Sequence, residues 1–353
     1  MMNQFLRQLY NLIFFIETRK CRRLGSVPPS ILFPVVWVTN RCNLRCKMCN
    51  QWKIAAGAPA EELSSREWYS FVDSAKHMHA AVIAVTGGEP LLREDIFDII
   101  KYIRKNQISC HLCTNGTLLN ELNVLRLKES KINSISVSLD SDCAQIHNRM
   151  RGIDCFDAVV RGIKLLRSTI PGLKIGINQV VTKINFRNMD RMIPFAESLK
   201  VDQIKFDRVH VNLMHRHRPL TDSDSLVFNK DDLPDLQREI AKLINAVSKT
   251  RLLTSSLTFM EGMADLCSAK MPRLDCYAGY ISCAVDAFGR VSPCDDFDGE
   301  ESLREKNLET IWQSASFQKL RQRVHSCNSS CWDTTHAELN IRCSDYGLSL
   351  IHI

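Results

Sequence analysis

The sequence predicts an α/β fold: a partial (β/α)₆ TIM-like barrel followed by a small, C-terminal, cysteine-rich α+β domain. Six short runs rich in Val and Ile alternate with helical patterns between residues 32 and 209. Repeated strand–helix units of this kind form a parallel sheet through right-handed crossovers, and six units make an incomplete version of the eightfold barrel. From Cys276 onward, the sequence changes to a segment rich in cysteine.

The predicted strands are apolar on both faces, as parallel strands covered by helices are. They span residues 32–39, 81–86, 108–114, 133–139, 173–181 and 202–209. Helices are predicted between them at residues 63–79, 94–106, 118–129, 155–169 and 187–199, and a further one at 231–249. Several begin at a typical start signal, such as Ser64 and Ser65 followed by Glu67. The C-terminal part predicts a hairpin around Phe288 and Gly289 and a helix near 307–323.

The changes in sequence character divide the chain into three predicted parts. Residues 1–30 form a basic amphipathic segment, residues 31–255 the strand–helix core, and residues 256–353 the C-terminal domain. The apolar run 9–16 in the first part is too short to span a membrane, which takes about 20 apolar residues. No small-residue cleavage site follows it. Two interpretations stay open: a helix packed on the main domain, or an interfacial helix whose basic flank contacts anionic lipid.

Charge and cysteine content narrow the class of protein. The 353 residues include 15 cysteines and carry a formal net charge of +7. An odd number of cysteines in a chain of this size without an export signal indicates a reducing compartment, so we predict a cytoplasmic protein whose thiolates bind metal. The positive charge favours anionic partners of some kind.

Three cysteines follow the first predicted strand at close spacing: Cys42, Cys46 and Cys49. Thiolates at these gaps can bind one iron–sulfur cubane from a single loop. Three protein ligands for four irons leave one iron open, which distinguishes a chemical site from a closed structural one. A zinc loop or simple core thiols is the alternative, although no fourth zinc ligand is obvious after Cys49.

Polar or glycine-rich signals follow the next three strands too. They are Thr86-Gly87-Gly88-Glu89-Pro90, Thr114-Asn115-Gly116 and Ser138-Leu139-Asp140. Reactive groups of parallel barrels sit on loops at the C-terminal ends of the strands, so these signals should converge with the cysteines on one face. Glycines let backbone approach a ligand closely, and Glu89 could accept a hydrogen bond from an ammonium group.

At this point the residues resemble the radical SAM superfamily. The matching residues are Cys42, Cys46 and Cys49 in its cluster-binding pattern, and Gly87, Gly88 and Glu89 in its GGE motif. The resemblance covers about residues 30–210. It implies a 4Fe–4S cluster whose free iron is chelated by S-adenosylmethionine (SAM), with the GGE residues positioning the SAM amino group. Ser138 is then expected to contact the ribose or carboxylate, and Asn115 completes the predicted SAM site. One electron would split SAM into methionine and a 5′-deoxyadenosyl radical, which abstracts a hydrogen atom.

A second set of cysteines resembles the auxiliary-cluster tail called twitch, a shorter relative of SPASM. Its members are Cys276, Cys294, Cys327 and Cys331, with Gly289 between the first two. The likeness implies one further 4Fe–4S cluster, and four thiolates would close its shell, which favours electron relay over substrate binding. Cys283 or Cys343 could replace one ligand. Zinc is the rival, because a tetrahedral set of four sulfurs suits either metal.

Substrate and partners are open at this stage, and no catalytic side chain is assigned. The first hypothesis is an anionic small-molecule substrate, since the Arg residues of His215-Arg216-His217-Arg218 could bind phosphate or carboxylate; a solvated charge run is the alternative. The second is a maturase of a ribosomally made peptide, although only about 30 residues precede the first strand and leave little room for a leader-binding domain. The third is a non-catalytic zinc-binding protein. An electron donor such as flavodoxin or ferredoxin is expected, peripheral membrane contact is an option, and nucleic acid is not expected.

Five further residues lie in or near the predicted strand ends. Cys110 and Cys113 have the spacing of a redox motif but lie inside an apolar strand, which predicts buried core thiols. Asp140, His147 and Arg151 could shape the pocket, although their spacing is not decisive.

Overall fold

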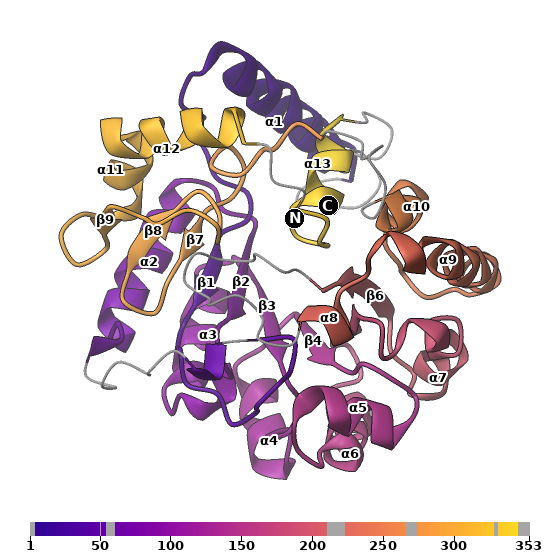
Figure 1. Cartoon of the computed structure of the whole chain (residues 1–353). Coiled ribbons are helices and arrows are strands. Elements are labelled where there is room, and N and C mark those ends of the chain that lie inside the picture. The colour runs from indigo at the N-terminus through magenta and orange to yellow at the C-terminus, as the bar shows by residue number, and fades with distance from the viewer. Residues whose placement is uncertain are drawn as a thin grey trace.

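A computed structural model describes residues 4–49, 51–53, 61–209, 223–265, 274–327 and 331–344 of the chain. Six parallel strands form its curved core, each paired with its neighbours in chain order (Figure 1). They are β1 (Val35–Trp37), β2 (Val82–Thr86), β3 (Ser109–Thr114), β4 (Ser134–Ser138), β5 (Lys174–Val181) and β6 (Gln203–Arg208). The predicted α/β fold and partial barrel are confirmed, and within the described ranges the sheet keeps two open edges, β6 and β9.

Helices cover the convex face of this sheet (Figure 1). They are α2 (Ser65–His77), α3 (Ile96–Lys105), α4 (Glu121–Glu129), α5 (Ala144–Arg151), α6 (Phe156–Thr169) and α7 (Met192–Ser198). Alternate strand residues such as Val36, Val85 and Ile177 point into this layer and belong to the main hydrophobic core. Helix α5 was not predicted from the sequence, because it is short and its face is polar.

The concave face of the sheet is polar. Strand register places Thr86 beside Trp37, and Ser138 beside Asn178, which in turn lies beside Lys205. Partners in a parallel ladder point to the same face, so this row of side chains crosses the interior of the partial barrel. In these parallel strands, apolar side chains toward the helices therefore alternate with polar side chains toward the interior, which the sequence pattern did not predict.

The C-terminal domain extends the same sheet. Strand β7 (Ala284–Val285) pairs parallel to β1, and β8 (Arg290–Ser292) and β9 (Glu301–Ser302) follow as antiparallel neighbours. The predicted hairpin is thus present, and Gly289 turns it at a φ of 89°. The single predicted helix near 307–323 is two helices, α11 (Leu308–Gln313) and α12 (Ala315–His325), because Ser314 ends one and caps the next by accepting from Phe317 N at 3.1 Å.

Helix α1 (Gln4–Leu24) packs on the C-terminal domain rather than on the strand–helix units (Figure 1). Phe14, Phe15 and Cys21 lie in one apolar cluster with Tyr277 and Tyr280. The Arg22 guanidinium donates to the carbonyl of Cys276 at 2.8 Å and pairs with Asp275 at 2.9 Å. Among the helices described, none has the length and apolar character needed to cross a membrane.

Four further α-helices lie in the described ranges: α8 (Ser223–Leu226), α9 (Leu233–Val247), α10 (Leu257–Asp265) and α13 (Ala337–Ser344). Trp332 packs against α10, because its ring stacks on Phe259 and its indole N–H donates to the carbonyl of Phe259 at 2.8 Å. A Cβ at Gly262 would lie 1.9 Å from this ring. The close contact ties the segment after Cys331 to the core.

We expect Gly262→Ala to destabilise the protein although alanine favours helix over glycine by about 1 kcal/mol. The Trp332 ring would have to leave its stack, and overpacking of this kind costs about 1–3 kcal/mol. Thermal unfolding measures the effect, with Gly172→Ala as the control, because a Cβ there meets nothing within 4 Å. A variant more stable than the parent would contradict the packing argument.

Candidate active site

The three cysteines of the first cluster line one cavity at the C-terminal end of the sheet. Cys42, Cys46 and Cys49 lie on the loop after β1 and border a cavity of about 160 Å³. The predicted convergence of strand ends is present, since the cavity wall also includes the following residues: Thr86, Gly87, Gly88, Thr114, Asn115 and Ser138. No cysteine of the second cluster is among its lining residues.

The glycine loop after β2 holds the start of the cysteine loop through backbone alone. Gly88 N donates to Thr39 O and Glu89 N to Arg41 O, both at 2.8 Å. A Cβ at Gly88 would lie 2.1 Å from the carbonyl oxygen of Arg41, and one at Gly87 would lie 2.4 Å from that of Thr39. Glycine is therefore required here by close backbone contact between two loops, before any ligand is considered.

Helix α5 holds the other side of the cysteine loop. Arg45 N donates to Arg151 O at 3.3 Å and Lys47 N to Met150 O at 2.9 Å, so the loop uses carbonyls left unpaired at the helix C-terminus. Gly152 ends α5 at a φ of 79°, and a Cβ there would lie 2.5 Å from Arg45 O. The unpredicted helix is thus a structural support of the site.

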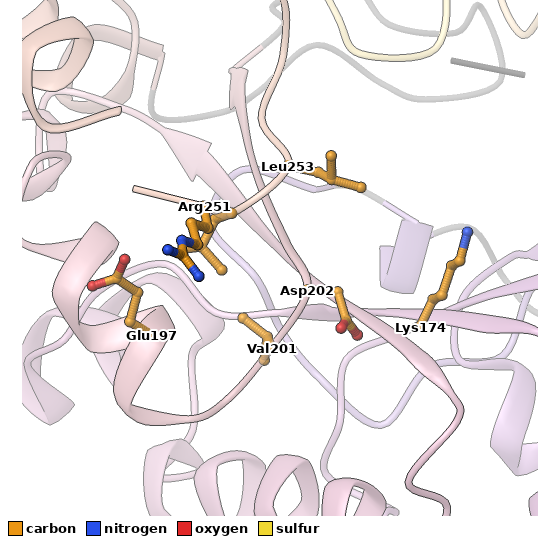
Figure 2. A pocket seen from close by; sticks show the side chains of 7 residues that line it. Lys174, Glu197, Val201, Asp202, Arg251 and Leu253 are labelled. Atoms are coloured by element: carbon orange, nitrogen blue, oxygen red, sulfur yellow. The ribbon is translucent and has the colours of Figure 1, made fainter. Parts of the chain in front are cut away.

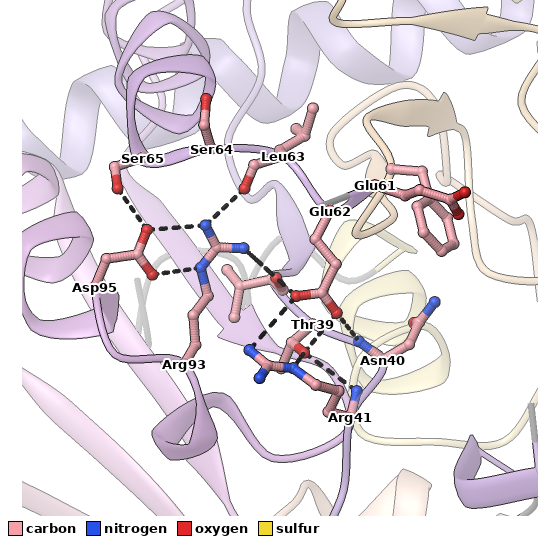
Figure 3. A network of polar contacts seen from close by, with 12 residues as sticks. Thr39, Asn40, Arg41, Glu61, Glu62, Leu63, Ser64, Ser65, Arg93 and Asp95 are labelled. Carbon is pink, nitrogen blue, oxygen red and sulfur yellow. Dashed lines mark hydrogen bonds and ion pairs between the residues drawn. The ribbon is translucent and has the colours of Figure 1, made fainter. Parts of the chain in front are cut away.

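A buried polar network fixes the residues just before Cys42 (Figure 3). Glu62 accepts from Thr39 Oγ1 at 2.7 Å and from Asn40 N at 3.0 Å. The Arg93 guanidinium donates to Val38 O at 2.8 Å and to Leu63 O at 2.6 Å. Sequence reasoning missed both residues, because a lone Glu and a lone Arg carry no spacing signal.

Glu89 is fully buried and its carboxylate joins the loops after β2 and β3. One oxygen accepts from Leu91 N at 3.1 Å and Thr114 Oγ1 at 2.8 Å, and the other accepts from Asn115 N at 2.7 Å. Burial raises the pKa of Glu89 to about 7 despite these hydrogen bonds, which lower it. Its first role in this structure is to lock two loops together.

The end of β3 contributes an amide and a thiol. Asn115 Nδ2 donates to Asn43 Oδ1 at 2.8 Å, which links β3 to the cysteine loop. Cys113 borders the cavity as well, so the expectation of two buried core thiols holds for Cys110 and is wrong for Cys113. The reason is strand alternation, since Cys110 points to the helix layer and Cys113 to the interior.

A buried ion pair stands behind Cys46. Arg151 pairs with Asp140 through Nε at 2.6 Å and Nη2 at 2.9 Å, and its Nη1 lies 3.9 Å from Cys46 Sγ. His147 Nδ1 accepts from the backbone N–H of Asp140 at 3.2 Å. Burial and the nearby Arg151 charge lower the pKa of His147 to about 3, so the imidazole is neutral.

The three thiols fit an iron–sulfur cluster as a donor set. Burial raises the pKa of Cys46 to about 12, and it raises the pKa of Cys42 and of Cys49 as well. Iron binds a cysteine as the thiolate, so a bound cluster would hold these three buried groups deprotonated. The bordering cavity leaves space beside them for a cofactor on an open coordination position.

The second set of cysteines gathers around Val324. Cys294 and Val324 share an apolar cluster against which Cys276 packs, and Cys327 N donates to Val324 O at 3.1 Å. Burial raises the pKa of Cys331, and nearby Asp296, Asp333, Cys294 and Cys276 raise it further. Of the two replacement ligands considered, Cys283 lies in the main core and Cys343 in the cluster with α1.

The segment after Cys331 reaches back to the interior of the barrel. Asp207, on the concave face of β6, accepts from Thr334 N at 2.7 Å and from Thr334 Oγ1 at 3.0 Å. Burial and nearby Asp333 raise the pKa of Asp207 to about 6. The contact joins the second cysteine region to the sheet face that also carries Ser138.

A larger hollow, of about 440 Å³, lies at the opposite end of the sheet (Figure 2). Lys174 begins β5 and Asp202 precedes β6, so this hollow borders the N-terminal ends of the strands. Asp202 is engaged by Arg167 at 2.6 Å and by Ile175 N at 2.8 Å. That end of a parallel barrel serves stability rather than chemistry. The basic stretch His215–Arg218 lies outside the described residues.

Two known protein families match this chain over the regions that contain the two sets of cysteines. The family model of the radical SAM superfamily matches residues 36–193. The model of the iron–sulfur cluster-binding domain SPASM matches residues 276–333. The two matches contain both sets of cysteines, and the second favours iron–sulfur over zinc for the C-terminal set.

Individual relatives fall into two groups. An AdoMet-dependent heme synthase of Oleidesulfovibrio alaskensis is 31% identical over 47% of this chain and 42% of its own length, so the chain spans less than half of that relative. The mycofactocin maturase MftC of Mycobacterium tuberculosis is 24% identical over 83% of this chain and 73% of its own. The crystal structure of Streptococcus suis SuiB bound to precursor peptide SuiA superposes with a TM-score of 0.66 at 19% identity, covering 92% of this chain and 73% of that one.

The raised pKa of Glu89 predicts a pH dependence of stability. The native pKa of about 7 lies above the ordinary 4.5, so between these values the native state binds more protons than the unfolded state. The free energy of unfolding therefore falls as pH rises from about 4.5 to 7, by at most about 1.4 kcal/mol per pH unit. Urea unfolding at pH 5 and pH 8 should show this fall in the wild type and a smaller one in Glu89→Gln. Glu121→Gln, on the exposed start of α4, is the control, and equal pH slopes in all three proteins would contradict the assignment.

Proposed function

Because the chain belongs to the radical SAM superfamily and carries a SPASM-type iron–sulfur domain, we propose that it reductively cleaves SAM and abstracts a hydrogen atom from its substrate. One observation carries the proposal. Three thiols, a glycine loop and two polar strand ends border a single cavity at the C-terminal end of the sheet. Such an arrangement suits a cofactor with an open coordination position and a ligand beside it.

The proposal assigns roles to eight residues in or beside the cavity. Cys42, Cys46 and Cys49 hold the SAM-binding 4Fe–4S cluster. The residues proposed to contact SAM are Gly87, Gly88, Glu89, Asn115 and Ser138. A reduced cluster supplies the electron that cleaves SAM.

The protein contributes the fixed position of the reacting groups. Glu89 acts on the site mainly by locking the loops after β2 and β3, since both of its oxygens accept hydrogen bonds from those loops. The α5 carbonyls and the buried Arg93 hold the two sides of the cysteine loop. A rigid loop keeps the reacting groups at fixed separation, which lowers the entropic cost of reaction.

We propose three functional parts with the bounds predicted from the sequence. Residues 1–30 are the basic amphipathic segment, residues 31–255 the radical SAM core, and residues 256–353 the auxiliary domain. Cys276, Cys294, Cys327 and Cys331 hold one auxiliary 4Fe–4S cluster that relays electrons, and the SPASM match supports this assignment.

A peptide is the first substrate class to test. The relative MftC, a maturase, aligns with four fifths of this chain including the C-terminal domain, whereas the heme synthase aligns with about half. The PqqA peptide cyclase of Granulibacter bethesdensis likewise aligns over 80% of the chain. An anionic small molecule is the second class, favoured by the positive net charge of the sequence.

The proposed partners and location follow from the chemistry. Reductive cleavage requires one electron per turnover, which a flavodoxin or ferredoxin can supply. A reducing compartment keeps cysteines free of disulfides and so available to bind iron, and we therefore propose the cytoplasm.

Peripheral membrane contact is proposed for α1. Ile13 and Ile16 are 54% and 48% exposed, and Lys20 and Arg23 are exposed one and two turns further along the same face. Apolar side chains beside basic ones suit the surface of an anionic membrane.

The central prediction concerns iron and SAM. After anaerobic reconstitution we expect about eight irons per chain, the content of two cubane clusters, and about four in the variant with Cys42, Cys46 and Cys49 changed to Ala. Under dithionite, only proteins with the first cluster should form 5′-deoxyadenosine from SAM. Cys143→Ala, which removes a thiol before α5, should retain both properties. Zinc in place of iron without SAM cleavage would refute the proposal.

The membrane proposal is tested separately. Wild-type protein should co-sediment with vesicles containing phosphatidylglycerol more than with pure phosphatidylcholine, and the double variant Ile13→Asp/Ile16→Asp should lose most of this binding. The matched control is Leu122→Asp/Leu125→Asp on α4, where both leucines are also exposed, at 65% and 49%. Equal loss in both variants, or none in either, would count against a role for α1.

A further inference from the structure

The guanidinium of Arg151 lies between a proposed cluster ligand and a buried carboxylate. Its Nη1 is 3.9 Å from Cys46 Sγ, whereas Nε and Nη2 pair with the two oxygens of Asp140 at 2.6 and 2.9 Å. Arg151 also borders the cavity that holds the three thiols. A positive charge is therefore built into the wall of the site, on the side of one particular cysteine.

This charge has little freedom to move away. Asp140 is fully buried, and Oδ1 accepts from Val180 N at 3.0 Å in addition to Arg151. The carbonyl of Asp140 accepts from Asn185 Nδ2 at 2.8 Å, and its N–H donates to His147. One hydrogen bond from Nη2 and one ion pair through Nε hold the guanidinium at two points, which a lysine ammonium could not reproduce.

A fixed cation beside a cluster sulfur favours the reduced cluster. Reduction adds one negative charge, and a nearby positive charge in a poorly solvated site stabilises that charge. Charge and hydrogen bonds near the sulfurs are among the main influences on cluster potential. The negative charge of Asp140 disfavours the reduced cluster. The guanidinium of Arg151, however, contacts both Cys46 and Asp140 and so lies between them.

We propose that Arg151 raises the reduction potential of the cluster bound by Cys42, Cys46 and Cys49, and that Asp140 positions it for this role. The inference rests on the proposed function, because it requires the cluster to be present. Arg151 is in this view a positioning and tuning residue whose effect is measured on the resting cluster in the absence of SAM.

The test is a redox titration followed by electron paramagnetic resonance on the reconstituted, SAM-free enzyme. The signal that changes when SAM is added afterwards identifies this cluster. Arg151→Met should lower its midpoint potential by at least 59 mV, a tenfold change in the ratio of reduced to oxidised cluster at a fixed potential. Arg151→Lys should lower it less, and Arg238→Met, which removes an exposed charge on α9, should leave it unchanged.

A second variant guards against simple misfolding. Asp140→Asn keeps an oxygen that can accept from Nη2 of Arg151 but removes the opposing negative charge, so it should raise the potential. Disruption of the site would not produce shifts of opposite sign in the two variants. An unchanged potential in Arg151→Met with full iron content overturns the inference, and a lower SAM affinity in that same case would assign Arg151 to the SAM carboxylate instead. If the wild type cleaves SAM while the potential of Arg151→Met is unchanged, only the inference about Arg151 fails. If the wild type itself does not cleave SAM, the proposed function fails.

Discussion

The backbone of Gly88 lies so close to that of Arg41 that no side chain fits between them. Two hydrogen bonds cross this contact, and they fix where the cysteine loop leaves β1. The loop then reaches the last carbonyls of α5 on its other side, so its two ends are held by different units of the barrel. Glu62, in the segment before α2, and Arg93, in the segment before α3, add a third support. The segments after β2 and β4 must therefore be in place, together with the segment before α2, for the cysteine loop to take this shape.

Much of the fold and of the site could be predicted because their signals are local. Runs of Val and Ile marked all six strands, and motifs at their ends marked the cysteine and glycine loops. The supports of the site could not be predicted in this way, because they are single residues far apart in sequence. Arg93 contacts Leu63, and Asp207 contacts Thr334, 127 residues away, without any spacing that marks them.

Two expectations were wrong for the same physical reason: that the strands are apolar on both faces, and that Cys113 lies in the core. The strand with Cys110 and Cys113 was expected to be apolar throughout, yet only its outward residues pack in the core. A partial barrel whose interior takes a cofactor leaves its concave face polar, and strands there alternate as half-exposed strands do. The parallel pairing of β7 with β1 was unpredicted for another reason, since two-residue strands carry almost no pattern.

The packing of α1 has a consequence for how the protein is made. This helix leaves the ribosome before every strand of the sheet, but its apolar face packs on Tyr277, Tyr280 and Cys343. Strand β1 likewise receives its partner β7 only after some 250 residues of intervening chain. Contacts between distant segments form late, because loop closure must precede them. During synthesis the apolar side of α1 thus stays without its partner until the C-terminal residues are made, and exposed apolar surface of this kind favours aggregation.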